Sequence, residues 1–144
     1  MPHILIAQTD HHIAACFDAM SELRPQLQRA QFVSRVRELQ RTTGFNLAYL
    51  VLDDQVQSVA GYRISDWLVG GRYLEVEDLV CVAASRSKGY GGLLLEWLCR
   101  HAVAQQCRHA RLVSGVQRHD AHRFYETNGF VREAYYYSKK LATP

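Results

Sequence analysis

The feature that most constrains this sequence is a β-rich run that passes through a glycine-rich turn into a helical pattern. Residues 73–82 form the run, residues 86–92 form the turn (R-S-K-G-Y-G-G), and Leu94, Leu98 and Ala102 then recur on one helical stripe. A turn of this kind leaves the first N–H groups of the helix without partners, and the helix dipole attracts negative charge to them. Because glycines carry no Cβ that would block an anion, the turn predicts a phosphate site.

Two other phosphate motifs do not fit this turn. A dinucleotide fingerprint needs a third glycine where Leu94 stands, and a P-loop needs Gly-Lys-Ser/Thr where the order here is Ser87-Lys88-Gly89. A lone R-x-x-G-x-G pattern is more often an ordinary strand-to-helix turn, so the neighbouring residues must decide.

Carboxylates lie just upstream of the turn. Glu75 and Glu77 share one face of the expected strand by its period of two, and Asp78 follows them. Each one alone is most simply explained as part of a solvated strand face. Beside an anion-binding turn, a crowded or buried carboxylate can have a raised pKa and act as a general base.

The remaining patterns predict an α/β domain with a mixed sheet and helices on both sides. Connections between residues 46 and 82 are too short for a crossover, so those strands are expected to be antiparallel. The strand after the central helix is expected to run parallel to residues 73–82. Gly61 is expected to mark a bulge or a close approach. The expected strands are 4–7, 46–52, 56–65, 73–82, 110–114 and 130–138, the last being one strand or a pair. Four helices are expected. The first covers 11–23, the second contains Phe32, Val36 and Leu39 and ends at Gly44, the third is the central one after the turn, and the fourth is capped by Asp120 and runs to about Asn128 before Gly129.

Composition excludes several classes of protein. The 144 residues fit one domain, 1–144, and 48% hydrophobic with 22% charged residues is typical of a soluble globular chain. No apolar run approaches the ~20 residues of a membrane span, and residues 1–10 do not resemble a secretion signal, so we expect a cytoplasmic protein with no membrane partner. The net charge of +3 comes from scattered Arg and Lys residues, which argues against a nucleic-acid partner.

The sequence gives little support for metal-dependent or thiol-dependent chemistry. The cysteines are Cys16, Cys81, Cys99 and Cys107. Their wide spacing favours reduced, mostly buried thiols, and Cys81 lacks an adjacent base for an acyl-carrying role. His119 and His122 could share a metal, but with only two ligands evident a solvated or substrate-facing pair is favoured, and no metal is expected.

A third motif, residues 121–130 (A-H-R-F-Y-E-T-N-G-F), completes a family resemblance. By itself its Tyr125 would be an amphipathic core residue. Together with residues 77–82 (E-D-L-V-C-V) and the turn at 86–92, in this order and spacing, it resembles the GNAT N-acetyltransferase superfamily. The motifs cover about residues 75–130, and the element order covers nearly the whole chain.

The resemblance implies a GNAT-like α/β fold with a mixed, mostly antiparallel sheet, helices on both faces and a splay between the central strands, 73–82 and 110–114. Acetyl-CoA would lie in that gap, with its pantetheine against the strand backbone and its pyrophosphate on the turn. Arg118 stands where the family often has Asn, and Ala83 where it often has Pro. The residues expected to bind acetyl-CoA are Leu79, Val80, Cys81, Arg86, Ser87, Lys88, Gly89, Tyr90, Gly91, Gly92 and Arg118.

The resemblance also implies catalytic roles. Glu77 matches the general base of the small-amine branch, which includes spermidine/spermine acetyltransferases, while Glu75 stands where the histone-acetylating branch places its base, so the choice stays open. Tyr125 matches the tyrosine that hydrogen-bonds the CoA sulfur. We expect an N-acetyltransferase that moves an acetyl group from acetyl-CoA to an amine by direct attack in a ternary complex. A small amine is favoured, and a protein or peptide amine remains open.

One alternative function and one expected partner accompany this expectation. The same fold could serve as a non-catalytic CoA-binding or regulatory module. A homodimer is an expectation from the family and from the tyrosine-rich segment 135–137, whose stacking use is less favoured than a strand or dimer contact.

Overall fold

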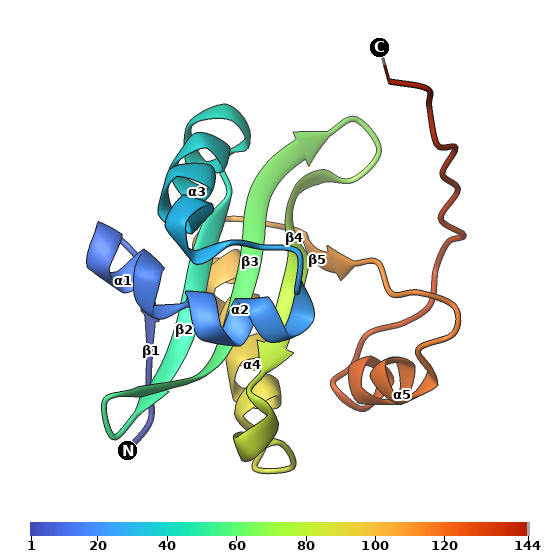
Figure 1. Ribbon diagram of the computed structural model, residues 1–144. Coiled ribbons are helices and arrows are strands. Elements are labelled where there is room, and N and C mark those ends of the chain that lie inside the picture. Colours follow the sequence, from blue (N-terminus) through green and yellow to red (C-terminus); the bar gives the residue numbers. More distant parts are fainter. Residues whose placement is uncertain (144) are drawn as a thin grey trace. The chain divides into compact units, whose positions relative to one another are not determined.

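The computed structural model describes residues 1–143, and the chain divides into two compact units, Met1–Leu112 and Val113–Pro144. Of the elements that the described residues form, the first unit carries all five strands and four of the five α-helices (Figure 1). Its elements are β1 (His3–Ile6), α1 (Asp10–Ala15), α2 (Phe17–Leu23), α3 (Arg29–Thr43), β2 (Asn46–Leu52), β3 (Gln55–Trp67), β4 (Gly71–Cys81), a 3₁₀ turn (Ala83–Ser85), α4 (Tyr90–Ala104) and β5 (His109–Leu112). The second unit contains α5 (His119–Thr127).

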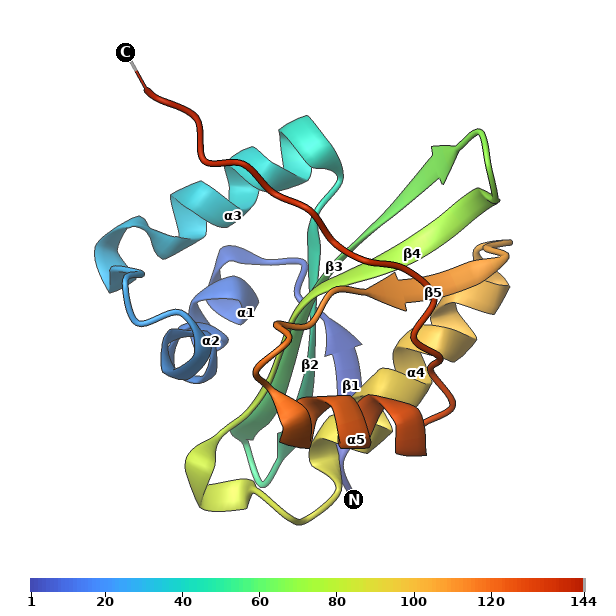
Figure 2. The same ribbon diagram turned by 90° about the vertical axis from the view of Figure 1, so that its right-hand side faces the viewer.

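The sheet has the order β1-β2-β3-β4-β5. Its first four strands are antiparallel neighbours, and β5, which follows α4, pairs parallel to β4. Helices α1, α2 and α3 cover one face of the sheet and α4 covers the other (Figure 2). The predicted mixed, mostly antiparallel sheet with helices on both faces is therefore confirmed.

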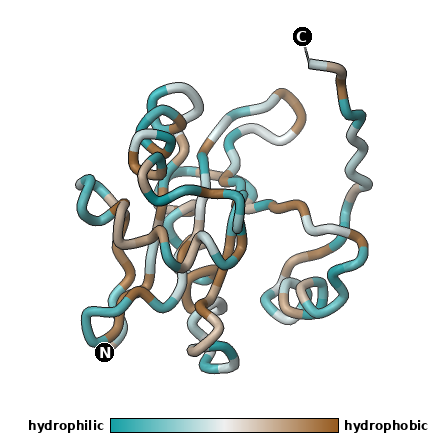
Figure 3. Tube along the Cα trace, in the orientation of Figure 1, coloured by the Kyte–Doolittle hydropathy of each residue, from teal (hydrophilic) through white to brown (hydrophobic). Residues whose placement is uncertain are grey.

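Apolar side chains fill both layers between sheet and helices. On the α1–α3 side, the buried cluster joins residues of those helices to β2, β3 and β4. On the other side, the predicted stripe of α4 is buried, and His101 of α4 packs edge-on against Tyr62 of β3. The hydropathy colouring also marks the β3–β4 turn, where Leu68 and Val69 are exposed apolar residues (Figure 3).

In β4, a β-bulge lies at the position where the pairing with β5 ends. Asp78 pairs with Gly61 and Val76 pairs with Tyr62, so Glu77 has no residue opposite it on β3. Pairing between β4 and β5 covers Tyr73 to Val76 only, within the part of the chain that the structure describes. The predicted splay between the central strands therefore begins at Glu77, where β4 also bends.

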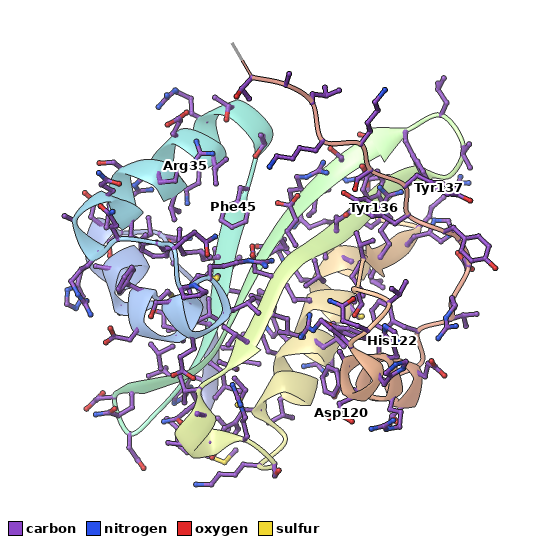
Figure 4. All side chains as sticks on the ribbon, turned by 45° about the vertical axis from the view of Figure 1, so that its right-hand side comes forward. Arg35, Phe45, Asp120, His122, Tyr136 and Tyr137 are labelled. Carbon is purple, nitrogen blue, oxygen red and sulfur yellow. The ribbon has the colours of Figure 1, made fainter. Side chains whose placement is uncertain are left out.

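Gly61 shows why the bulge needs a residue without a side chain. A Cβ added there would lie 2.4 Å from Oδ2 of Asp78 and 2.6 Å from Cζ of Phe45, closer than real contacts allow. Phe45 is a buried residue between α3 and the sheet (Figure 4). The prediction of a bulge or close approach at Gly61 is confirmed in both respects.

Three local predictions were wrong. The expected helix 11–23 is two helices that meet at Cys16, whose N–H bonds Ile13 in a tighter turn. The last helix begins at His119 with Arg118 as its N-cap, so Asp120 lies in the first turn and pairs with Arg123 instead of capping. The expected strand 130–138 does not form in the described chain; Tyr136 and Tyr137 lie exposed on an extended segment, because a β-prone sequence becomes a strand only where a sheet edge accepts its backbone hydrogen bonds (Figure 4).

Among the described helices, none combines the length and the apolar character that crossing a bilayer requires.

Candidate active site

The glycine-rich turn is held by contacts on its strand side. The N–H of Val82 donates to the carbonyl of Gln57 (2.9 Å), and the N–H of Ala83 donates to Oε1 of Glu22 on α2 (2.9 Å). Ser87 and Gly89 then adopt left-handed backbone angles, with φ of 69° and 83°. These two reversals turn the chain into α4, as the sequence pattern predicted.

The backbone N–H groups of this turn form a run of unused donors. Leu93 is the first residue of α4 whose N–H bonds within the chain, to the carbonyl of Gly89 (3.0 Å). From Ser87 to Gly92, no N–H donates to an acceptor among the described residues. Arg86 and Lys88 add positive charge beside them. Consecutive free N–H groups at a helix N-terminus are a site at which an anion can bind.

Glu77 projects from the bulge in β4, on the α1–α3 side of the sheet. Its Oε2 accepts a hydrogen bond from Nε of Arg63 (2.9 Å), and about a third of its side chain is exposed (34%). Arg24, which follows α2, donates from Nη2 to the Glu77 carbonyl (3.2 Å). The carboxylate is thus oriented by its neighbours while it still reaches solvent.

Glu75 is more enclosed than Glu77. It is 8% exposed, and its Oε1 accepts a hydrogen bond from Nε of Arg111 on β5 (2.5 Å). The Arg111 guanidinium lies 4.3 Å from the ring centroids of both Trp67 and Tyr73. Of the two glutamates that the sequence left as candidate bases, Glu77 has the more exposed side chain.

Asp78 lies beside Glu77, but its side chain makes an internal contact. Its Oδ1 accepts a hydrogen bond from Nε of Arg24 (2.9 Å). Burial raises the pKa of Asp78 above its usual range, and the Arg24 guanidinium opposes that rise. The residue thus links β4 to the end of α2 at the position where β4 bulges.

The thiol of Cys81 is partly buried. Burial raises its pKa, and the charge of Arg86 partly offsets that rise. A raised pKa reduces the thiolate fraction that nucleophilic attack requires. The acyl-carrying alternative for Cys81 therefore gains no support, and its backbone, with that of Leu79 and Val80, lies on the part of β4 that has no β5 partner in the described chain.

The second unit holds the two remaining predicted residues, Tyr125 and Arg118. The N–H of Phe130 donates to the Tyr125 carbonyl (3.0 Å), and the two rings lie 6.1 Å apart. Burial raises the pKa of Tyr125, while the charge of Arg118 lowers it. The approach of Tyr125 and Arg118 to Glu77 and to the turn stays a prediction.

The histidine pair of α5 does not gather further ligands. The rings of His119 and His122 are 5.7 Å apart, and Nε2 of His122 lies 2.7 Å from the carbonyl of Gly115. No group of three His, Cys, Asp or Glu side chains suited to a metal occurs among residues 1–143.

Sequence reasoning missed the arginines that surround the glutamates. Arg63 stands between Tyr62 and Ile64, and Arg111 between Ala110 and Leu112; a charged residue between two apolar strand neighbours was the available signal. Their partners are 14 and 36 residues away in the sequence, so only the strand register identifies them.

Comparison with known proteins now assigns the family. The sequence model described as "Acetyltransferase (GNAT) family" matches residues 8–130. The chain belongs to the GNAT acetyltransferase family. A Bacillus subtilis (strain 168) protein named "Uncharacterized N-acetyltransferase YhdJ" is 31% identical over 142 residues, which cover 98% of this chain and 100% of that relative.

Solved structures agree with the GNAT fold. A putative acetyltransferase from Agrobacterium tumefaciens matches with a TM-score of 0.84 at 19% identity, over 96% of this chain and 99% of the other. AAC(6')-Iy in complex with the bisubstrate analog CoA-S-monomethyl-acetylneamine matches with a TM-score of 0.82 at 14% identity, over 98% and 99%. Family membership makes acyl transfer the general chemistry of this GNAT chain.

Proposed function

We propose that this GNAT protein transfers an acetyl group from acetyl-CoA to an amine by direct attack in a ternary complex. One observation carries the proposal: the run of N–H groups from Ser87 to Gly92, which have no acceptor in the described chain, follows the strand whose bulge presents Glu77 after a single 3₁₀ turn. An anion cradle joined by one strand to a partly exposed carboxylate suits a substrate with a diphosphate at one end and a reactive group at the other.

Acetyl-CoA would bind along β4 and the turn. Its pyrophosphate would accept hydrogen bonds from the free N–H groups, with Arg86 and Lys88 adding charge, and Arg118 is the further contact expected from the family resemblance. Its pantetheine would pair with the backbone of Leu79 to Cys81, where β5 no longer occupies the strand edge. The CoA-derived analog named in the AAC(6')-Iy structure supports this cosubstrate for the fold.

The chemistry follows from the ionisation of the reacting groups. An alkyl amine has a pKa of about 10.4 and must lose a proton before its lone pair can attack the thioester. Glu77 would accept that proton, directly or through water, as the new N–C bond forms. The C–S bond then breaks, and Tyr125 would donate a proton to the leaving thiolate, whose pKa is about 8.5. A backbone N–H of β4 near the bulge would stabilise the oxyanion formed between these steps.

The test is a thiol-release assay with acetyl-CoA and a broad panel of amines. Glu77→Gln and Tyr125→Phe are each expected to lower kcat by about 10²–10⁴-fold, because each removes one proton-transfer group. Both variants should fold and bind acetyl-CoA like the parent chain. Glu96→Gln and Tyr135→Phe make the same chemical changes at exposed positions and should leave kcat unchanged.

Two results would count against the proposal in different ways. Unchanged turnover in both active-site variants would remove the roles given to Glu77 and Tyr125. Tight binding of coenzyme A without turnover of any amine would favour the non-catalytic CoA-binding module instead.

A further inference from the structure

A row of alternating charges crosses the sheet beside Glu77. The register places Arg63 of β3 opposite Glu75 of β4, and Glu75 opposite Arg111 of β5. Since neighbouring strands are separated by about 5 Å, the two arginines start about 10 Å apart on one face of the sheet. Glu77 lies next along β4 on the same face and is bonded to Arg63.

The guanidinium of Arg111 is held in place by its neighbours, but only part of its hydrogen-bond donors have an acceptor. Its Nε donates to Glu75, and its guanidinium lies over the rings of Trp67 and Tyr73. Neither Nη1 nor Nη2 donates to an acceptor among residues 1–143, and 39% of the side chain is exposed. A planar guanidinium that is fixed by packing and has two donor groups left is suited to bind a carboxylate or a phosphate.

Arg63 has a different task. Its Nε holds Glu77, and its Nη1 reaches Oγ of Ser65 (3.4 Å). The guanidinium therefore orients the proposed base, which makes Arg63 a positioning residue.

The charges around Glu77 are balanced. Each of the three carboxylates is paired with one guanidinium, so the site offers no excess of negative charge to a polycation. The pairs are Glu75–Arg111, Glu77–Arg63 and Asp78–Arg24. A polyamine would meet as much positive as negative charge here, which disfavours polyamines among the small amines that the family resemblance favours.

We infer that the acceptor of the proposed reaction is a small amine that also carries an anionic group, a carboxylate or a phosphate, which the free N–H groups of Arg111 bind. The inference rests on the proposed function and names the substrate class of that site. The amine end lies at Glu77 and the anionic end at Arg111, on the next strand and about two residues along.

The test uses matched acceptors that differ by the anionic group. Phenylalanine is compared with phenethylamine for a carboxylate, phosphoethanolamine with ethanolamine for a phosphate, and spermidine represents polyamines. For each acceptor, kcat/KM is measured by thiol release, and binding to the CoA-saturated protein is measured by calorimetry. We expect at least one anionic member to be preferred over its partner by about tenfold or more, as for a charge-assisted hydrogen bond.

The double variant Glu75→Gln/Arg111→Gln removes the pair without leaving a buried charge alone, and its net charge is unchanged. It is expected to reduce the ratio between anionic and neutral acceptors to about one. The matched control, Glu96→Gln/Arg100→Gln, removes an exposed pair on α4 and should keep the ratio.

The outcomes distinguish failure of the acceptor inference from failure of the acetyltransferase proposal. Preference for the neutral amines or spermidine, or an unchanged ratio in the Glu75→Gln/Arg111→Gln variant, would overturn the inference while the acetyltransferase proposal stands. Failure of coenzyme A to bind would end both. If coenzyme A binds but no acceptor turns over, the calorimetric ratio alone decides the inference.

Discussion

Gly61 offers the sharpest test of how the bulge in β4 is built. Gly61→Ala adds one methyl group, whose carbon would lie 2.4 Å from Oδ2 of Asp78 and 2.6 and 2.7 Å from two ring carbons of Phe45. The carboxylate of Asp78 can rotate away, at the expense of its bond to Arg24. The ring of Phe45 is 6% exposed and packed against the core, so it can move only if its neighbours move.

The expected magnitude follows from this crowding. Adding a methyl group to a well-packed interior costs about 1–3 kcal/mol of the free energy of unfolding. For a chain of this length, 1 kcal/mol lowers the melting temperature by about 2–4 °C, so the central value of about 2 kcal/mol corresponds to about 4–8 °C. Displacing Asp78 also weakens the contact between Arg24 and β4, so kcat/KM should fall as well.

The assay is a double-mutant cycle measured by urea denaturation. Phe45→Leu removes the two ring carbons that meet the new methyl group, so it should be less destabilising in the Gly61→Ala background, with a coupling of about 1 kcal/mol or more. Gly89→Ala is the control, because its cost comes from a left-handed φ of 83° with no atom within 4 Å of the added carbon. Gly89→Ala and Phe45→Leu should be additive to about 0.5 kcal/mol. If Gly61→Ala and Phe45→Leu are equally additive, the steric argument is refuted.

Three further predictions concern charged residues. Burial raises the pKa of Asp78 in the folded state, so the protonated side chain stabilises the fold fully below the unfolded pKa of about 3.8, and this stabilisation is lost as the pH rises through the folded pKa. Asp78→Asn should abolish this part of the pH dependence of the free energy of unfolding, measured by denaturation from about pH 3 to 7. Arg111→Gln leaves the carboxylate of Glu75 buried and unpaired, so it should lower the free energy of unfolding by about 2–4 kcal/mol, more than the Glu75→Gln/Arg111→Gln pair does; equal losses would show that the ion pair is not buried enough to matter. Lys88→Gln should weaken coenzyme A binding by about 3- to 10-fold in calorimetry, with a smaller effect at high salt, and an effect independent of salt would argue against a phosphate contact.

The local features of this chain could be predicted because short-range physics fixes them. Gly44 ends α3 with a φ of 72°, where a left-handed residue was expected. The antiparallel pairing of β2, β3 and β4 and the parallel pairing of β5 with β4 also followed from connection lengths and from the helix between β4 and β5. Hydrophobic periodicity and turn residues act over a few positions, so the sequence displays them directly.

The predictions that failed depended on more distant neighbours. Residues 130–138 have the composition of a strand, yet a strand exists only where another strand takes its hydrogen bonds. The break at Cys16 interrupts a helical pattern that is continuous in the sequence. In both cases packing between elements outweighed local preference.

The sequence by itself determined the pairing directions of β2 to β5, the turn that precedes α4 and the family to which the chain belongs. Only the tertiary structure decided that Glu77 sits on a bulge held by Arg63, and that Arg111 neutralises Glu75 while keeping two donors free. The physical reason is that strand register and the bulge bring together side chains from three strands, and no pattern within one strand records which charge will face which.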